Sequence, residues 1–139
     1  MEEQPVTPKI AVAVRLDLEV WQKLNVTAFT TSGVTARRPD LVGGPYEDAS
    51  GQGYLSMLGH PVLVFGADAA GLTRAFRRAL DRGLAVAVYT DDLFATGNDV
   101  DNRAAVRAVA TDDLVLAGFA VAGPAKTVDK VVDKLRLHP

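Results

Sequence analysis

The fold of this chain depends on residues 9–15, which read KIAVAVR. Five apolar residues in a row, three of them β-branched, are typical of a strand that is buried on both faces of a sheet. A helix is expected next, from near Asp17 to a stop at Gly33, because the apolar residues after the strand have helical spacing. These residues are Trp21, Leu24, Ala28 and Phe29. We therefore predict a central strand followed by a helix that covers the sheet.

The second half of the chain alternates short apolar runs with amphipathic segments. Strands are expected at residues 61–66, 84–89 and 114–121. Helices are expected to begin at Asp68, at Asp99 or Asp101, and at Gly123-Pro124, since these residues favour helix N-termini. This alternation favours an α/β fold with βαβ units, mostly parallel strand pairing and helices on both faces of the sheet.

Two segments fall outside this pattern. Residues 1–8 are polar and contain two prolines, so we expect them to form a flexible lead-in. Residues 35–61 are rich in glycine and proline, and a hairpin across Ser50-Gly51 is expected within them. So long an irregular segment in a small domain is either a functional loop or an insertion that covers a sheet edge.

Length and composition limit the possible functions. At 139 residues the chain has room for a single domain, and its 48% hydrophobic and 23% charged residues are typical of an ordinary globular protein. Cysteine is absent, which excludes disulfides, thiolate nucleophiles and cysteine-ligated zinc. The sequence shows no export signal and no apolar stretch that could cross a bilayer, so a cytoplasmic protein without membrane contacts is expected.

A row of arginines follows the strand at residues 61–66, on the polar side of the expected helix. It consists of Arg74, Arg77, Arg78 and Arg82. Such a row can contact phosphates, but a charged stripe opposite an apolar stripe is normally the solvated side of a helix. With a net charge of −2, the chain is not expected to bind nucleic acid strongly, tRNA included.

Two polar loops are the candidates for a functional site. Ligands gather beyond the carboxyl ends of parallel strands, and residues 15–23 and 90–99 follow two of the predicted strands. Lys23 could stabilise an oxyanion or bind a carboxylate. Asp91 could orient or deprotonate a water, with Asp92 raising its pKa. If the two strands are neighbours, these side chains share a cleft; the alternative is that they are solvated surface residues.

Other residues near these loops are candidates for ligand binding. Asn25 and Thr27 lie within four residues of the candidate lysine, and they could bind a polar ligand or bond to nearby backbone. Trp21 is either a platform for a ligand or a packing aromatic. Asn98, also a candidate, opens the run NDVDN at 98–102, which lacks the glycine and glutamate of a calcium loop and is better explained by helix capping. No metal and no cofactor are therefore expected.

Three motifs resemble the domain-of-unknown-function 2000 (DUF2000) family over nearly the whole chain: VRLDLEVWQKLNVTAF at 14–29, YTDDLFATGND at 89–99 and GPAKTVDKVVDKLRLHP at 123–139. More distantly, they resemble type II peptidyl-tRNA hydrolases. Those enzymes have a Val-Arg-x-Asp-Leu pattern at the end of a strand, an aspartate after a later strand, and a closing Gly-Pro with Val-Asp-Lys-Val. All three patterns occur within these motifs.

The resemblance to these hydrolases implies a three-layer α/β/α sandwich on a small mixed sheet whose last strand is antiparallel. It also implies metal-free ester hydrolysis by a lysine, an aspartate and a threonine, which correspond in this chain to Lys23, Asp91 and Thr96. The chain departs from the pattern, since it has one lysine at the helix start instead of two. Threonines replace the glutamine and the His-Ala pair of that helix, and Thr96 matches only if one residue is inserted.

Two hypotheses of function follow. In the first, the chain is a small hydrolase that cleaves an ester or amide of an acylated amino acid, with Lys23, Asp91 and Thr96 as its catalytic residues. In the second, it is a non-catalytic module that binds a small ligand or regulates as a homodimer. The departures on the first helix favour the second hypothesis or a changed substrate.

Overall fold

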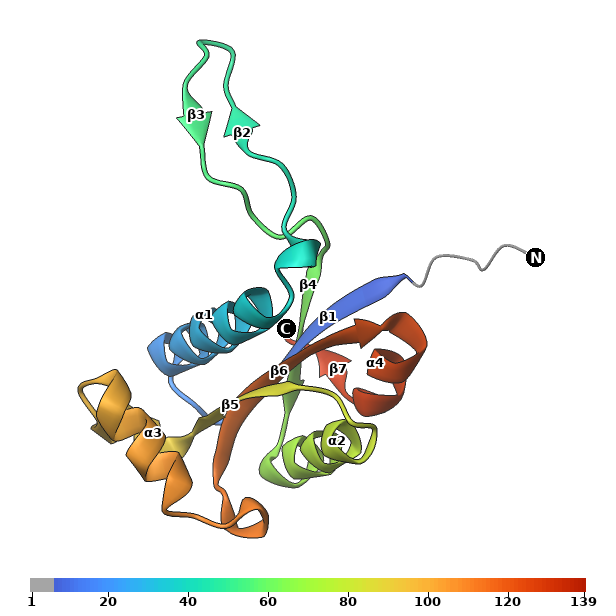
Figure 1. Ribbon diagram of the computed structural model, residues 1–139. Helices are drawn as coiled ribbons and strands as arrows, with labels where there is room; N and C mark the ends of the chain where they lie inside the picture. The colour runs from blue at the N-terminus through green and yellow to red at the C-terminus, as the bar shows by residue number, and fades with distance from the viewer. Residues whose placement is uncertain (1–6) are drawn as a thin grey trace.

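A five-stranded mixed sheet forms the centre of the protein, as the computed structural model of residues 7–139 shows (Figure 1). Its strands, in spatial order, are β5 (Val86–Thr90), β6 (Leu116–Pro124), β1 (Pro8–Arg15), β4 (Val62–Ala67) and β7 (Arg136–Leu137). The prediction that residues 9–15 form the central strand is confirmed. The expected lead-in lies outside the described residues, except for residues 7 and 8, and Pro8 already belongs to β1.

The mixed sheet implied by the resemblance is confirmed, whereas the mostly parallel pairing predicted from the alternation of strands and helices is wrong. Among the strands of residues 7–139, only β1 and β4 pair in parallel, whereas β6 is antiparallel to both β1 and β5, and β7 is antiparallel to β4. The reason lies in the connection from β5 to β6, which does not cross the sheet. The backbone N–H of Asp91 donates to the carbonyl of Val115 at 2.9 Å, so the chain re-enters the sheet at the edge where β5 left it. Because β6 starts at the end of the sheet where β5 stops, β6 must run antiparallel to β5.

Helices cover both faces of the sheet, which confirms the predicted α/β class. One face carries α1 (Val20–Arg37), and the other carries α2 (Ala69–Asp81) and α4 (Ala125–Val131). Side chains of β1 alternate between the two layers, as the pleat requires. Ile10, Val12 and Val14 belong to the core under α1, and Ala11 and Ala13 to the core under α2 and α4. Among residues 7–139, no helix is long and apolar enough to cross a membrane.

Helix α1 starts and ends later than predicted. It begins after Glu19, which forms a capping box with Gln22, and it continues through Gly33 to Arg37. Gly33 is therefore an internal residue. A Cβ atom at this position would lie 2.9 Å from the Cβ of Ala87 in β5, so glycine allows the helix to approach the sheet closely.

The other predicted helices are present, with one change at their N-termini. Asp68 caps α2 as expected, since its side chain accepts a hydrogen bond from the backbone of Gly71 at 2.7 Å. The cap of α3 (Asp99–Arg107) is Asn98, not Asp99 or Asp101. Two short 3₁₀ helices flank α3, namely η2 (Asp91–Ala95) and η3 (Thr111–Asp113).

A long hairpin projects from the body at the end of α1 (Figure 1). This arm, residues 42–58, contains β2 (Tyr46–Glu47) and β3 (Gly53–Tyr54) and follows η1 (Pro39–Leu41). The predicted turn at Ser50-Gly51 is confirmed. The alternative that the segment covers a sheet edge is wrong, because the arm extends away from the sheet.

The tip of the arm is held by Asp48. One carboxylate oxygen accepts hydrogen bonds from the backbone N–H groups of Ser50 at 2.9 Å and Gln52 at 3.0 Å, and the other accepts one from the Tyr54 hydroxyl at 2.7 Å. These bonds, chiefly that of Tyr54, lower the pKa of Asp48 from its ordinary value of 3.8.

Replacing Tyr54 by phenylalanine should raise the pKa of Asp48 towards 3.8, as an NMR titration of the carboxyl carbon would measure. Because the pKa of Asp48 is lower in the folded arm than in the unfolded chain, these hydrogen bonds stabilise the fold of the arm at pH values above the unfolded pKa of about 3.9. This stabilisation is lost as the pH falls through the pKa of the folded state. Tyr46→Phe is the matched control, because the Tyr46 hydroxyl does not donate to Asp48. Equal Asp48 pKa values in wild type and Tyr54→Phe would contradict the prediction.

Candidate functional site

The carboxyl ends of β1 and β5 are joined by a cluster of ionic hydrogen bonds around Arg15. Its Nη1 and Nη2 donate to the two carboxylate oxygens of Asp91 at 2.9 and 3.1 Å. Nη1 also donates to the carbonyl of Leu116 at 2.6 Å, and Nε donates to Asp17 at 2.6 Å. The Arg15 side chain is only 12% exposed. The guanidinium therefore spans β6 and ties the end of β5 to the end of β1.

This geometry gives Asp91 a partner that was not predicted from the sequence. Both of its oxygens accept a hydrogen bond from Arg15, and these bonds are the main reason that the pKa of Arg15 is raised. A two-pronged guanidinium–carboxylate pair of this kind fixes the orientation of both groups. The sequence did contain one indication that Arg15 belongs to this site: it is a charged residue at the end of a buried apolar strand. Asp92 is exposed next to this pair.

Lys23 lies near the start of α1 and is partly buried. Within residues 7–139 its ammonium group forms no ion pair, and no hydrogen bond joins it to Asp91. Thr27 donates its hydroxyl to the backbone carbonyl of Lys23 at 2.8 Å, which is the backbone-bonding alternative predicted for this residue. Asn25 is exposed on the same helix. The structure thus places Lys23 and Asp91 on elements that start at the same sheet edge without a direct bond between them.

Thr96 and Asn98 form bonds within their own loop. The Thr96 hydroxyl donates to the carbonyl of Leu93 at 2.9 Å and also contacts the side-chain amide of Asn102. The side-chain oxygen of Asn98 accepts from the backbone of Asp101 at 2.8 Å and caps α3. No hydrogen bond in the described part of the chain links Thr96 to the candidate lysine or aspartate. These two polar side chains stabilise the entry into α3.

Four aromatic rings connect α1, η2 and β5. Trp21 meets Phe94 edge-on at a centroid distance of 5.9 Å, and Phe94 lies 5.0 Å from Tyr89. Tyr89 in turn lies 6.0 Å from Phe29. Trp21 therefore contacts the segment after β5 while 56% of it stays exposed, so its role as a platform for a ligand stays a prediction.

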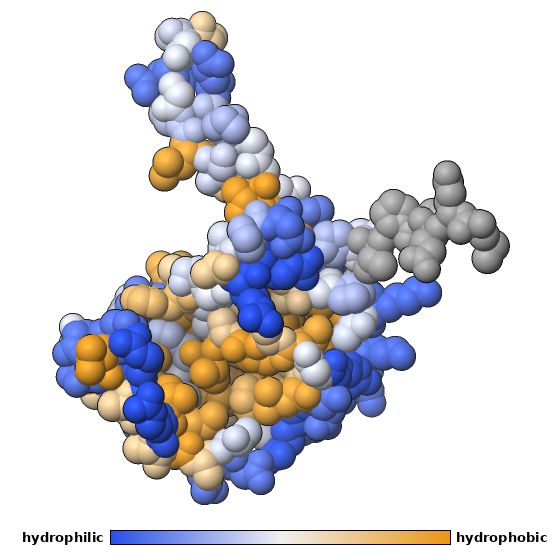
Figure 2. Space-filling view, viewed as in Figure 1, coloured by the Kyte–Doolittle hydropathy of each residue, from blue (hydrophilic) through white to orange (hydrophobic). Residues whose placement is uncertain are grey.

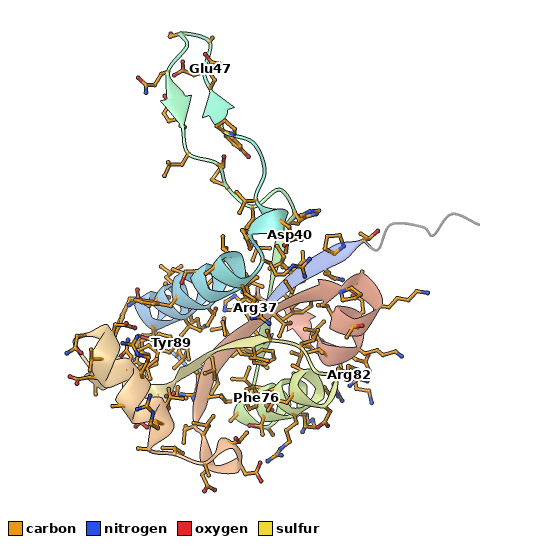
Figure 3. The ribbon with its side chains drawn as sticks, viewed as in Figure 1. Arg37, Asp40, Glu47, Phe76, Arg82 and Tyr89 are labelled. Carbon is orange, nitrogen blue, oxygen red and sulfur yellow. The ribbon has the colours of Figure 1, made fainter. Side chains whose placement is uncertain are left out.

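Helix α1, strand β5 and helix α3 line an open pocket of about 610 Å³, which we call the α3 pocket. Two of the four rings, Phe29 and Tyr89, belong to its lining. Its apolar walls are formed by Phe29, Tyr89, Leu93 and Val106. Figure 3 shows Tyr89 at the end of β5 between the two helices, and Figure 2 shows apolar surface between α1 and α3. Burial raises the pKa of the Tyr89 hydroxyl, so this group stays neutral at physiological pH.

Polar side chains line the rest of the α3 pocket. They are Thr30 from α1 and Asp99, Asn102, Arg103 and Arg107 from α3. Arg103 is paired with Asp99 one turn earlier on the helix. Arg107 forms no ion pair among residues 7–139. This pocket was not predicted from the sequence, although Leu93 and Phe94 stand out as apolar residues in an otherwise polar loop.

The arginine row predicted on α2 lies on the other face of the sheet from the α3 pocket. Arg77 forms an ion pair with Asp112 at 2.8 Å, and Arg78 donates to the carbonyl of Asp133 at 3.0 Å. Figure 3 shows Arg82 at the end of α2, well away from Tyr89. Arg82 also donates to the carbonyl of Arg78 at 3.5 Å, so protein groups already bind three of the four arginines. Weak binding to nucleic acid stays a prediction.

Residues 8–139 match the model of a family described as a protein of unknown function (DUF2000). A solved structure of a protein of unknown function from Agrobacterium tumefaciens strain C58 is similar, with a TM-score of 0.92 and 38% sequence identity. The likeness covers 95% of this chain and 98% of that one. Among curated proteins, no sequence matches. The motifs, the family model and the shared fold agree, and the chain belongs to the DUF2000 family.

Proposed function

We propose that this protein binds a small amphipathic anion, an apolar group joined to a carboxylate, in the α3 pocket. The observation that carries the proposal is the combination of an apolar pocket of about 610 Å³ with Arg107, a guanidinium without an ion-pair partner among the described residues. Small-molecule sites have this character, with mostly apolar walls and a few polar groups that set the orientation of the ligand.

The apolar walls of the α3 pocket suit the apolar group of such a ligand, and its arginines suit the carboxylate. Phe29 and Tyr89 offer ring surface that an apolar group can cover, which removes apolar area from water. The charge of Arg103 is already balanced by Asp99. Arg107 is left to donate two parallel hydrogen bonds to a carboxylate, a geometry that an ammonium group cannot match. An N-acylated amino acid has both features.

A second proposal is metal-free hydrolysis of an acylated amino-acid ester or amide. It is favoured by the position of Lys23 and Asp91, because α1 follows β1 and η2 follows β5 at one edge of the sheet. Water would attack the carbonyl carbon while the carboxylate of Asp91 takes its proton, and Lys23 would stabilise the charge on the carbonyl oxygen. The bond to the alcohol or amine would then break, and that group would leave with the proton from Asp91. The ion pair of Asp91 with Arg15 fixes that carboxylate but occupies one acceptor position on each oxygen.

Titration with N-phenylacetylglycine, followed by calorimetry and by NMR shifts, tests the binding proposal. Arg107→Gln should weaken binding about tenfold, because a charge-assisted pair contributes on the order of 1.5 kcal/mol. The neutral amide of the same compound should bind wild type and this variant equally. Phe29→Ala should weaken the binding of both compounds. Arg82→Gln, the same change on α2 away from the pocket, is the matched control.

Failure of wild type to bind the acid at millimolar concentration would refute the proposal, as would equal affinity of wild type and Arg107→Gln.

The ethyl ester of the same compound separates the two proposals. Release of ethanol that Lys23→Ala and Asp91→Ala both abolish would support hydrolysis. If the ester binds but no ethanol is released, the hydrolysis proposal is refuted and only the binding proposal remains.

A further inference from the structure

We propose that the arm is a dimerisation element: it docks on a second copy of this chain, in a groove between the end of α1 and the start of β5, while the partner's arm docks reciprocally. This groove, about 570 Å³ in volume, is called the β5 groove below. The inference does not rest on the proposed function, because the residues that carry it, those of the arm and Arg37, do not line the α3 pocket; the β5 groove adjoins that pocket at Gly33 and Ala87.

The arm carries large apolar side chains that its own chain does not cover. Tyr46 is 52% exposed, Tyr54 54%, Leu55 87% and Met57 57%. A two-stranded hairpin has no second layer in which to bury such residues. Figure 2 shows apolar atoms on the part of the arm nearest the body. Contiguous exposed apolar residues on a projecting element are typical of a protein–protein contact.

The arm is also built to hold its side chains in place. At its base, the backbone N–H of Gly43 donates to the carbonyl of Met57 at 2.8 Å, and that of Gly59 donates to Leu41 at 2.8 Å. At its tip, Asp48 binds the turn and the Tyr54 hydroxyl. Because the hairpin is already ordered, docking costs less conformational entropy than ordering a free loop would.

The β5 groove has the apolar surface and the position that such an arm requires. Its apolar lining includes Val34 on α1, Ala87 in β5 and Ala122 in β6, together with Leu84 just before β5. The groove reaches Arg37 and Arg38, the residues that lead from α1 into the base of the arm. Arm and groove therefore lie at the same end of the molecule. A two-fold axis there would set the two arms side by side, with each tip on the partner's groove.

Charge complementarity selects a second copy as the occupant. Residues 42–58 contain Glu47 and Asp48 and no lysine or arginine. The β5 groove is lined by Arg37 and Arg38 and by no acidic residue. Arg38 is neutralised by Asp40 at 2.9 Å, whereas Arg37 forms no ion pair within residues 7–139. Figure 3 shows Glu47 far from Arg37 in one chain, so these two charges can meet only between copies.

Sedimentation equilibrium tests the proposal. Wild type should have twice the mass of one chain, and Leu55→Asp and Arg37→Glu should each weaken the dimer at least tenfold. Leu55 is almost fully exposed, so its replacement should leave thermal unfolding of the dissociated chain unchanged. Val115→Asp is the matched control, since Val115 is 58% exposed and lies outside both the arm and the groove. This variant should remain dimeric.

Charge reversal tests the orientation of the dimer. Glu47→Arg should weaken the dimer as Arg37→Glu does, and the variant that combines both changes should recover it, because each arm then carries the charge opposite to that of its groove. A wild type that is monomeric at about 0.5 mM would overturn the proposal. A dimer that Leu55→Asp and Arg37→Glu leave intact would also overturn it, and failure of the double variant to recover would exclude the pairing of Glu47 with Arg37.

Discussion

Replacing Gly118 by alanine is expected to destabilise the protein by about 3 kcal/mol, because this glycine lies where α1 presses on the sheet. Gly118 is in β6, between Val14 of β1 and Tyr89 of β5. A Cβ atom there would lie 2.5 Å from a methyl group of Val26 and 2.6 Å from the carbonyl oxygen of Ala13. Val26 is fully buried and the carbonyl belongs to the central strand, so neither can move without shifting its whole element.

Urea unfolding of Gly118→Ala and of Gly44→Ala measures this effect. Gly44 lies in the arm, where a Cβ atom would have no neighbour within 4 Å. The control should therefore change the free energy of unfolding by less than about 0.5 kcal/mol. If both variants unfolded at the same urea concentration, close packing of α1 at Gly118 would be excluded.

Replacing Phe119 by alanine should cost about 3–5 kcal/mol, the usual range for a buried phenylalanine. Phe119 is 1% exposed on the α2 face of β6 and meets Phe76 edge-on at a centroid distance of 5.9 Å. Figure 3 shows Phe76 on α2, beside the sheet. Truncation would leave a cavity that the packed layer of Ala75, Ala79 and Val128 cannot fill, because these side chains are short and rigid.

The matched control makes the same change at a ring that belongs to the α3 pocket. Phe29 is 56% exposed, so Phe29→Ala should lower the free energy of unfolding by less than about 1 kcal/mol. Thermal or chemical unfolding of both variants separates the two roles. A loss for Phe29→Ala as large as that for Phe119→Ala would show that Phe29 supports the core rather than the pocket.

The Arg15–Asp91 pair changes the interpretation of the predicted site. A polar loop at the carboxyl end of a strand predicted a catalytic carboxylate, but a structural ion pair satisfies the same pattern. The pairing of Asp91 with Arg15 could not be predicted from the sequence, because the two residues are 76 positions apart. They meet only because β6 lies between β1 and β5 in the sheet. The family match and the likeness to a solved structure support the fold, and neither assigns an activity to these residues.

Elements with local signals could be predicted from the amino-acid sequence. The apolar run at residues 9–15 is a buried strand, Asp68 caps the helix that follows β4, and the turn at Ser50-Gly51 closes a hairpin. Each depends on residues within a few positions of one another, such as a run of apolar side chains, a side chain that reaches its own helix N-terminus, or a glycine at positive φ. These contacts are the same in many folds, so they can be predicted without the rest of the chain.

The strand directions, the partner of Asp91 and the two open surfaces depend on how the elements pack in three dimensions. The antiparallel entry of β6 follows from where the chain returns after α3, and residue patterns in β6 are the same for either direction. Gly33 and Gly118 have a role only because β5 and α1, respectively, lie against them. The α3 pocket and the β5 groove exist between elements that are distant in sequence. Their shapes depend on packing, which no local pattern encodes.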